Sequence, residues 1–181
     1  MTSAGPPVLC VIGRKNAGKT GLTVALAAEL NRRGYRVMTV KHGHGFLIDS
    51  PGKDSWRHRH EGGAVRTVMA GPRDFAVVGG WPGEEMSLRE LVERFLWDAD
   101  IVLAEGFKSA PEPKIEIFRM GTHSAPLFDP GDPACARTLA LVTDDAELKA
   151  PIPVFSLEDP ELVRPLADFV ETSFQLRGSE A

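Results

Sequence analysis

The hydrophobic pattern at the start of the chain predicts a strand, a helix and a second strand. Residues 8–12 form a continuous apolar run of the kind that a buried parallel strand needs. In residues 21–33, leucine and alanine recur at helical spacing and predict a helix with one apolar face. A second strand is predicted at residues 35–40. This order implies a right-handed crossover between two parallel strands.

The remaining pattern continues the alternation of strands and helices and predicts an α/β protein with a mostly parallel sheet. Residues 114–118 differ from the other strands because polar and apolar residues alternate, which predicts a half-exposed strand. Pro165 is expected to kink the last helix or to delay its start. The other predicted elements are strands at 65–70, 75–78, 100–105, 138–142 and 152–155, a helix after the capping box 87–90, an irregular loop at 120–137 and a last helix from Asp159.

Length and composition fit one soluble globular domain. The 181 residues predict a single domain over residues 1–181, with residues 1–7 and 177–181 frayed. The formal net charge of −4 argues against general nucleic-acid binding. No apolar run approaches the ~20 residues that span a membrane, so no membrane segment is expected. Only Cys10 and Cys135 are present, and we expect a reducing, cytoplasmic environment.

The segment between the first strand and the first helix fits the phosphate-binding pattern G-x-x-x-x-G-K-[ST] of a P-loop, or Walker A motif. Its glycines let the backbone approach an oxygen closely, and its N–H groups surround a phosphate together with the helix N-terminus. Lys19 is expected to reach the β- and γ-phosphates, and the Thr20 hydroxyl to ligate Mg²⁺. The predicted nucleotide-binding residues are Gly13, Lys15, Asn16, Ala17, Gly18, Lys19, Thr20 and Gly21.

Glu105 ends the apolar strand 100–105, which is the form of a Walker B element. The carboxyl end of that strand is expected beside the P-loop, where the carboxylate reaches Mg²⁺ directly or through water. Lys19 and Glu105 are therefore the candidate catalytic groups, and we predict a P-loop NTPase fold with three α/β/α layers.

Residues 41–60 hold four of the five histidines and begin where a strand ends, at the edge where open α/β sheets bind ligands. One interpretation is a polar loop followed by a solvated helix. The other is an anion-binding loop in which the histidines also assist a metal, although no third ligand is fixed by spacing. Asp49 and Asp54 are candidates for an outer Mg²⁺ contact, with Asp49 preferred.

Taken together, these motifs resemble the MobB family, the accessory GTP-binding proteins of molybdopterin guanine dinucleotide biosynthesis. The resemblance covers roughly residues 8–118. It rests on the P-loop 13–20, on Val40-Lys41-His42 with His44 and Asp49, on residues 51–55 with Arg57-His58, and on residues 103–108 followed by 113–116.

The resemblance implies a homodimer that binds GTP with Mg²⁺ and hydrolyses it weakly. It also implies a partner, a MobA-like molybdenum cofactor guanylyltransferase, which joins GMP to molybdopterin. Lys19 and Thr20 carry over as phosphate and Mg²⁺ contacts and Glu105 as the Walker B acid. Two departures are Gly21, where a second hydroxyl is common, and Gly45, where a second histidine often follows. Possible phosphate or cofactor contacts are Lys41, His42, His44, Arg57, His58 and Lys108.

Guanine preference is not decided by the residues themselves. The Asn-Lys-x-Asp signature is absent, and Asp144 either contacts the guanine edge or caps a helix. A small-molecule kinase and a metallochaperone GTPase remain alternatives to the accessory role. No glutamine can be assigned to position a water molecule, because Gln175 is the only one and lies near the end of the chain. That composition is consistent with slow turnover.

Overall fold

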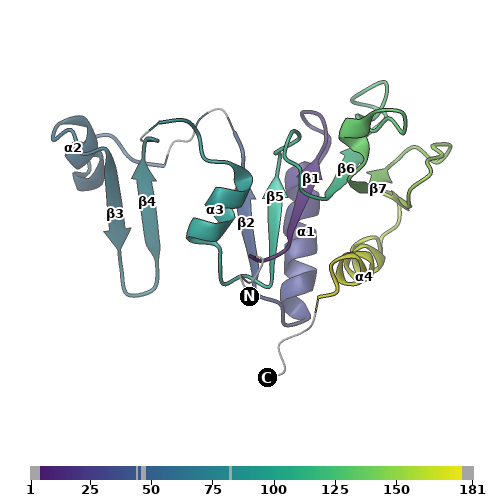
Figure 1. Ribbon diagram of the computed structural model, residues 1–181, viewed down its shortest axis with the longest axis horizontal. Helices are drawn as coiled ribbons and strands as arrows, with labels where there is room; N and C mark the ends of the chain where they lie inside the picture. Colours follow the sequence, from purple (N-terminus) through teal and green to yellow (C-terminus); the bar gives the residue numbers. More distant parts are fainter. Residues whose placement is uncertain (1–4, 44, 46–47, 82, 177–181) are drawn as a thin grey trace. The chain divides into compact units, whose positions relative to one another are not determined.

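The computed structural model describes residues 5–43, 45, 48–81 and 83–176 (Figure 1). The chain divides into two compact units, one formed by residues 1–42 with 88–181 and the other by residues 43–87. Fraying was predicted at residues 1–7 and 177–181, and of these 1–4 and 177–181 lie outside the described residues. The expectation of one domain over the whole chain stays a prediction.

The first unit is built on a six-stranded sheet in the order β2-β5-β1-β6-β7-β8, in which every neighbouring pair is parallel. β1 therefore lies inside the sheet between β5 and β6, and its carboxyl end opens at the same edge as theirs. The strands are β1 (Val8–Ile12), β2 (Val37–Lys41), β5 (Ile101–Glu105), β6 (Lys114–Phe118), β7 (Thr138–Thr143) and β8 (Val154–Ser156).

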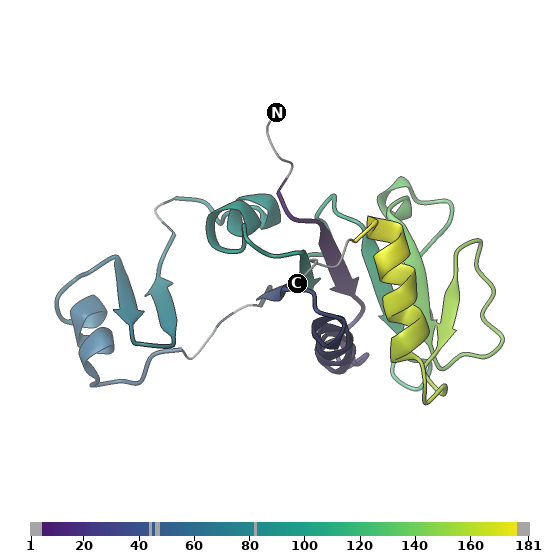
Figure 2. The same cartoon turned by 90° about the horizontal axis from the view of Figure 1, so that it is seen from below.

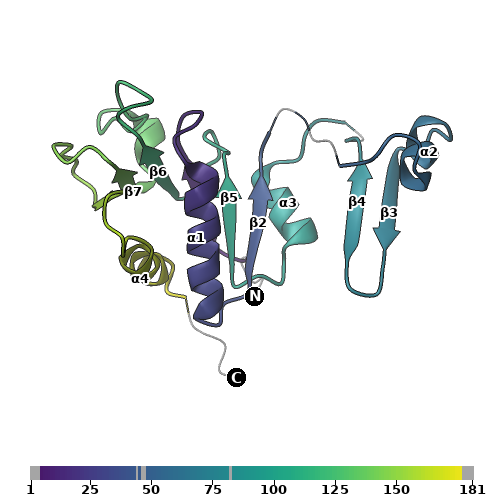
Figure 3. The same ribbon diagram turned by 180° about the vertical axis from the view of Figure 1, so that it is seen from behind.

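Helices cover both faces of this sheet. α1 (Lys19–Arg32) and α4 (Val163–Phe174) pack on one face, and α3 (Leu88–Phe95) packs on the other. Figure 2 shows α3 on the opposite side of the strands from α1, and Figure 3 shows α1 and α4 together in front of the sheet. The predicted three-layer α/β/α fold is confirmed.

Alternation along the strands divides the core into two apolar clusters. Leu9 and Val11 point to the layer of α1 and α4, whereas Val8 and Cys10 point to the layer of α3. Residues i and i+2 of a strand share one face, so the uninterrupted apolar run of β1 supplies both layers. Burial also raises the pKa of the Cys10 thiol to about 12, which keeps it protonated.

The prediction that residues 114–118 form a half-exposed strand is wrong. All five residues of β6 are buried, including Lys114 at 4% exposure and Glu116 at 1%. Their charged groups are hydrogen-bonded to the backbone of neighbouring loops, which lets polar side chains lie inside the protein. The expected delay at Pro165 is confirmed, because α4 begins at Val163 rather than at Asp159. The loop predicted at 120–137 contains a short 3₁₀ helix, η1 (Pro133–Cys135).

The second unit contains α2 (Asp54–His60) and an antiparallel hairpin of β3 (Arg66–Ala70) and β4 (Phe75–Gly79). α2 packs against β3 and buries none of its own residues. One face of the hairpin is apolar and exposed, with Val68 at 63% and Phe75 at 73%. Among the described residues, no helix of either unit is long and apolar enough to cross a bilayer.

Candidate functional site

The loop at residues 13–20 joins the carboxyl end of β1 to the first turn of α1. A Cβ at Gly13 would collide with the carbonyl oxygen of Ile117 on β6, so only glycine fits there. Gly18 has a φ of 105° and caps the N-terminus of α1. Asn16 has a φ of 64°, and Ala17 is buried. The backbone geometry is thus that of a tight loop opening onto a helix N-terminus, which favours an anion.

Thr20, Glu105 and Lys41 form a hydrogen-bonded group beside this loop. The Thr20 hydroxyl lies 2.9 Å from Oε1 and 3.0 Å from Oε2 of Glu105. The Lys41 ammonium lies 2.6 Å from Oε1 of the same carboxylate. Register explains the arrangement, because Glu105 pairs with Lys41 on β2 and with Val11 on β1. Three neighbouring parallel strands therefore end at one cluster of polar side chains.

Lys19 donates a hydrogen bond of 2.7 Å to the carbonyl oxygen of Arg14 within the loop. Burial lowers the pKa of Lys19 below its ordinary value of 10.5, and the charges of Lys108 and Lys41 lower it further, while Glu105 opposes them. Several positive charges therefore converge on the P-loop, and an anion bound there relieves their repulsion. The loop carries the other predicted contact Lys15, and Gly21 follows in the first turn of α1.

His42 and Lys108 lie on loops that leave the same edge of the sheet. The His42 N–H donates to the carbonyl oxygen of Glu105 at 3.0 Å, and its ring contacts Phe107 with centroids 5.2 Å apart. Gly106, between Glu105 and Phe107, has a φ of 96°, which turns the chain sharply after β5. Lys108 follows on that turn. All three predicted anion contacts of this unit, Lys41, His42 and Lys108, are thus carried by the backbone that surrounds Glu105.

Asp144 directly follows β7 at the carboxyl edge of the sheet. In the strand order, β7 and Glu105 on β5 lie on opposite sides of β1 and its P-loop. Its Oδ1 accepts a hydrogen bond of 2.7 Å from the Met120 N–H, and its Oδ2 lies 3.6 Å from the Arg119 guanidinium. These contacts join Asp144, just after β7, to the first residues of the loop between β6 and β7. No helix follows Asp144 in the described residues 145–150, so the helix-cap alternative is wrong.

His123 contacts the P-loop, and sequence reasoning missed it. Its Nε2 lies 2.8 Å from the carbonyl oxygen of Lys15, and because a carbonyl accepts, Nε2–H is the donor. This histidine stands apart from the cluster at residues 41–60, so no local pattern pointed to it. The signal would have been its place on a loop that leaves the carboxyl end of a central strand.

The remaining predicted contacts belong to the second unit. Asp49 accepts a hydrogen bond of 2.8 Å from Ser55, and Arg59 lies 3.7 Å from its other oxygen. Arg57 pairs with Glu61 at 2.8 Å. His44 was also predicted to contact an anion and lies outside the described residues. Their roles toward a nucleotide or a metal stay predictions.

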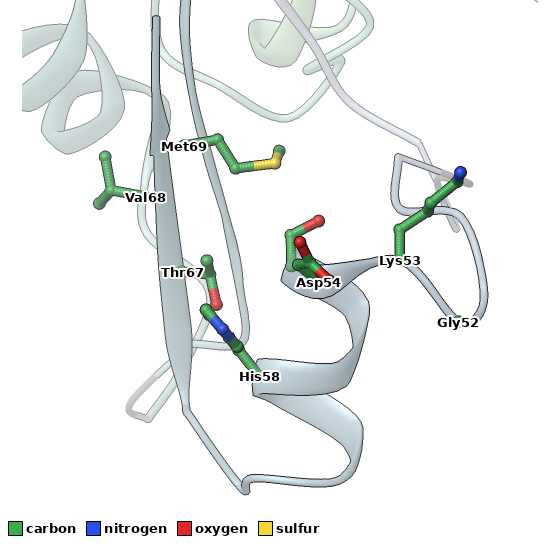
Figure 4. A pocket seen from close by; sticks show the side chains of 8 residues that line it. Gly52, Lys53, Asp54, His58, Thr67, Val68 and Met69 are labelled. Atoms are coloured by element: carbon green, nitrogen blue, oxygen red, sulfur yellow. The ribbon is translucent and has the colours of Figure 1, made fainter.

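His58 lines a cavity of about 630 Å³ between α2 and β3. Figure 4 shows its ring and the Thr67 hydroxyl pointing toward each other, with Asp54 at the start of α2 across the opening. The Thr67 hydroxyl is buried and has no hydrogen-bond partner in the described part of the chain. Over the same described residues, no group of three or more His, Cys, Asp or Glu side chains is placed to hold a metal ion.

Comparisons with known proteins agree with this fold. Residues 8–144 match the family model described as molybdopterin guanine dinucleotide synthesis protein B, or MobB. The chain is 34% identical over 168 residues to a molybdopterin-guanine dinucleotide biosynthesis adapter protein of Haemophilus influenzae, covering 91% of this chain and 88% of that protein. It is 33% identical over 167 residues to the Escherichia coli protein of the same name, covering 91% of each.

A solved structure extends the similarity to three dimensions. The crystal structure of Bacillus subtilis MobB matches with a TM-score of 0.69 at 26% identity, over 96% of this chain and 99% of that one. The family model covers the P-loop, the strand that ends at Glu105 and the loop that carries His123. The resemblance inferred from the motifs is confirmed, and the chain belongs to the MobB family.

Proposed function

We propose that this protein is an adapter of molybdopterin guanine dinucleotide biosynthesis that binds GTP with Mg²⁺ at the P-loop. The observation that carries the nucleotide site is the hydrogen bond between Thr20 and Glu105 beside Lys19, because a hydroxyl and a carboxylate then face a loop suited to phosphate. The family and the names of the relatives from Haemophilus influenzae and Escherichia coli support the pathway.

The side chains beside the P-loop fit Mg²⁺. Thr20 and Glu105 supply hard oxygen donors, which this ion prefers, and Mg²⁺ on a triphosphate keeps several waters and takes few protein ligands. The Lys41 ammonium already pairs with Glu105 at 2.6 Å, so Mg²⁺ bound there would replace it as the counter-charge of the carboxylate. Bound there, the ion would neutralise phosphate charge, while Lys19 contacts the β- and γ-phosphates. A role of Asp49 toward Mg²⁺ stays a prediction, because Asp49 belongs to the second unit and contacts Ser55 and Arg59 there.

Asp144 is proposed to select guanine. A carboxylate at this edge accepts from the N1–H and the exocyclic amino group of guanine, whereas adenine offers no such pair of donors on that edge. Its Oδ2 has only the 3.6 Å contact with Arg119 among the described contacts, so an acceptor remains for a base. The positive groups Lys41, His42 and Lys108 of the first unit are proposed to contact phosphate or the anionic end of molybdopterin. A similar role for His44, Arg57 and His58 of the second unit stays a prediction.

GTP hydrolysis is proposed to be slow. The sole glutamine of the chain, Gln175, is the C-cap of α4 and is not at the carboxyl edge of the sheet. Lys19 and Glu105 would then act by positioning and charge, without a glutamine that orients the attacking water. We therefore propose that GTP binding, and not GTP turnover, assists a MobA-like guanylyltransferase in the cytoplasm.

The protein is also proposed to be a homodimer. The hairpin of the second unit exposes Val68, Val77 and Phe75 on one face, and a contiguous apolar face of this kind marks an interaction site. The register pairs Val68 with Val77 directly, so their side chains form one continuous surface. A second copy of the chain would remove this surface from water.

Calorimetric titration with GTP and with ATP, each with and without Mg²⁺, tests the nucleotide site. The proposal expects a Mg²⁺-dependent preference for GTP of about tenfold or more, the discrimination that a pair of hydrogen bonds to a base provides. Asp144→Asn serves as the matched variant. It should bind GTP no more tightly than ATP, while its affinity for ATP stays that of the parent protein. Equal or tighter binding of ATP would contradict the proposal and favour a kinase.

A further inference from the structure

Glu116 is a buried carboxylate to which the proposed nucleotide chemistry gives no part. It lies in the middle of β6 and is 1% exposed. Its Oε1 accepts from the Leu127 N–H at 2.6 Å, and its Oε2 accepts from the Phe128 N–H at 2.8 Å. Charge-assisted hydrogen bonds from two consecutive amides fix the direction of the loop that provides them. The carboxylate is therefore an anchor for the loop between β6 and β7, residues 119–137.

The first part of this β6–β7 loop is attached to the nucleotide site at two further points. His123 donates to the carbonyl oxygen of Lys15 in the P-loop at 2.8 Å. The Met120 N–H donates to Asp144 at 2.7 Å. Between the end of β6 and Phe128, the loop thus contacts the proposed phosphate side and the proposed base side. Leu127 and Phe128 follow His123 by four and five residues, so holding these two residues limits the path of the loop.

Glu116 is well placed to transmit this constraint. In the register between β1 and β6, it pairs with Ile12, the residue that immediately precedes the P-loop. Ile117, the next residue, has its carbonyl oxygen against Gly13. Glu116 and the residue that precedes the P-loop therefore lie side by side on adjacent buried strands. Closely packed strands of this kind deform little.

Lys114 makes the equivalent contact two residues earlier, on the same face of β6. Its ammonium donates to the carbonyl oxygens of Ala110 and, at 2.9 Å, Glu112. Those residues belong to the loop between β5 and β6 that carries Lys108. Two buried charges of one strand thus hold the two loops that flank the P-loop.

The structure assigns to Glu116 the role of a positioning residue for the nucleotide site: by holding Leu127 and Phe128, it sets the β6–β7 loop so that His123 rests on the P-loop and Asp144 is presented to a base. This role rests on the proposed function. An apolar side chain of similar size would fill the same space, yet it would leave two partly buried N–H groups without their acceptor and release the loop.

Glu116→Gln tests the assignment with little change in volume. The amide keeps one acceptor oxygen but turns an NH₂ group toward the second N–H, so one of the two hydrogen bonds is lost. Glu112→Gln is the matched control, because Glu112 is a buried carboxylate whose side chain contacts Arg89 at 3.7 Å and not the β6–β7 loop. His123→Ala removes the contact with the P-loop while leaving the anchor intact.

Two readouts are compared across these variants: amide hydrogen exchange by NMR without nucleotide, and GTP affinity by calorimetry. In Glu116→Gln, exchange at Leu127 or Phe128 should rise by about tenfold or more, as expected for loss of a buried hydrogen bond, and GTP affinity should fall by about three- to tenfold. In His123→Ala, affinity should fall similarly while exchange at Leu127 and Phe128 stays protected. Glu112→Gln should change neither quantity.

Two results would overturn the assignment. One is unchanged exchange at both amides in Glu116→Gln, and the other is faster exchange there with GTP affinity within twofold of the parent. If Glu116→Gln does not fold, Glu116→Asp keeps the charge, and the same two readouts apply to it. Absence of GTP binding by the parent protein would instead refute the proposed function, because the exchange experiment without nucleotide still reports on the anchor.

Discussion

The two units of this protein organise their polar residues in opposite ways. In the first unit, Thr20, Glu105 and Lys41 are brought together by three adjacent parallel strands that end at one edge. In the second unit, the histidines and arginines of α2 are carried by a helix that buries none of its residues. Where strand register fixes the backbone, residue types and their spacing in the sequence indicate which side chains form a site. Where a short exposed helix carries the charges, they indicate only a charged surface.

The largest expected contrast between the units is in stability. Leu103→Ala in β5 removes a fully buried side chain and should lower the free energy of unfolding by about 2–5 kcal/mol. Val68→Ala, on the exposed face of the hairpin, should change it by less than about 0.5 kcal/mol in dilute solution. Urea denaturation monitored by circular dichroism measures both.

The same pair of variants examines the proposed dimer when the protein concentration is raised. If a second copy covers the hairpin, the cost of Val68→Ala should grow with concentration while that of Leu103→Ala does not, because association stabilises only the covered surface. A cost of Val68→Ala that is small and constant up to millimolar concentration would refute a dimer through this face.

A second contrast concerns single positive charges. Lys19→Ala should weaken GTP binding by about 100-fold, the upper range for loss of a hydrogen bond to a charged group. Arg73→Ala removes one positive charge from the exposed hairpin turn of the second unit and should leave the affinity unchanged. Calorimetry at one ionic strength compares them, since long-range charge effects depend on salt. Equal losses in both variants would mean that net charge, not the P-loop, determines binding.

The smallest contrast is in pH dependence. Burial raises the pKa of Glu116 above 4.5, against the lowering influence of its hydrogen bonds from Leu127 and Phe128 and of the charges of Arg14 and Lys108. In the pH window between 4.5 and the raised pKa of Glu116, the folded protein therefore binds more protons than the unfolded chain. The contribution of this group to stability is present below that window and is lost as pH rises through it.

Protonation also removes one acceptor from the β6–β7 loop. On acidification through the same window, exchange at Leu127 and Phe128, corrected for its intrinsic pH dependence, should rise by a few-fold. Amides of the hairpin, such as Val68, should show no such rise, and neither should Leu127 and Phe128 in Glu116→Gln. An equal rise at the hairpin would indicate general loosening of the protein.

The fold and the P-loop edge could be predicted from the sequence because both depend on short, regular patterns. An apolar strand followed by glycines and a helix leaves few alternatives, and the strand that ends at Glu105 is similarly regular. The ion pair between Lys41 and Glu105 was not predicted, since it requires β2 and β5 to be neighbours although they are far apart in the chain.

The burial of β6 was predicted wrongly for a related reason. Alternation of polar and apolar residues usually means that one face meets water, but Lys114 and Glu116 meet backbone groups of loops instead. Those loops have no periodic pattern, so nothing in the sequence indicates that they cover the strand. His123 escaped notice because its contact with Lys15 arises from the same loop.

The ion pair of Lys41 and Glu105 also gives the protein a resident counter-ion. A carboxylate that ligates a metal becomes an uncompensated charge whenever the metal departs, which disfavours departure. In this structure the Lys41 ammonium, on the adjacent strand, lies 2.6 Å from the Glu105 carboxylate and balances its charge. If Glu105 ligates Mg²⁺ as proposed, departure of the ion would leave the carboxylate paired with Lys41 and not as an uncompensated charge.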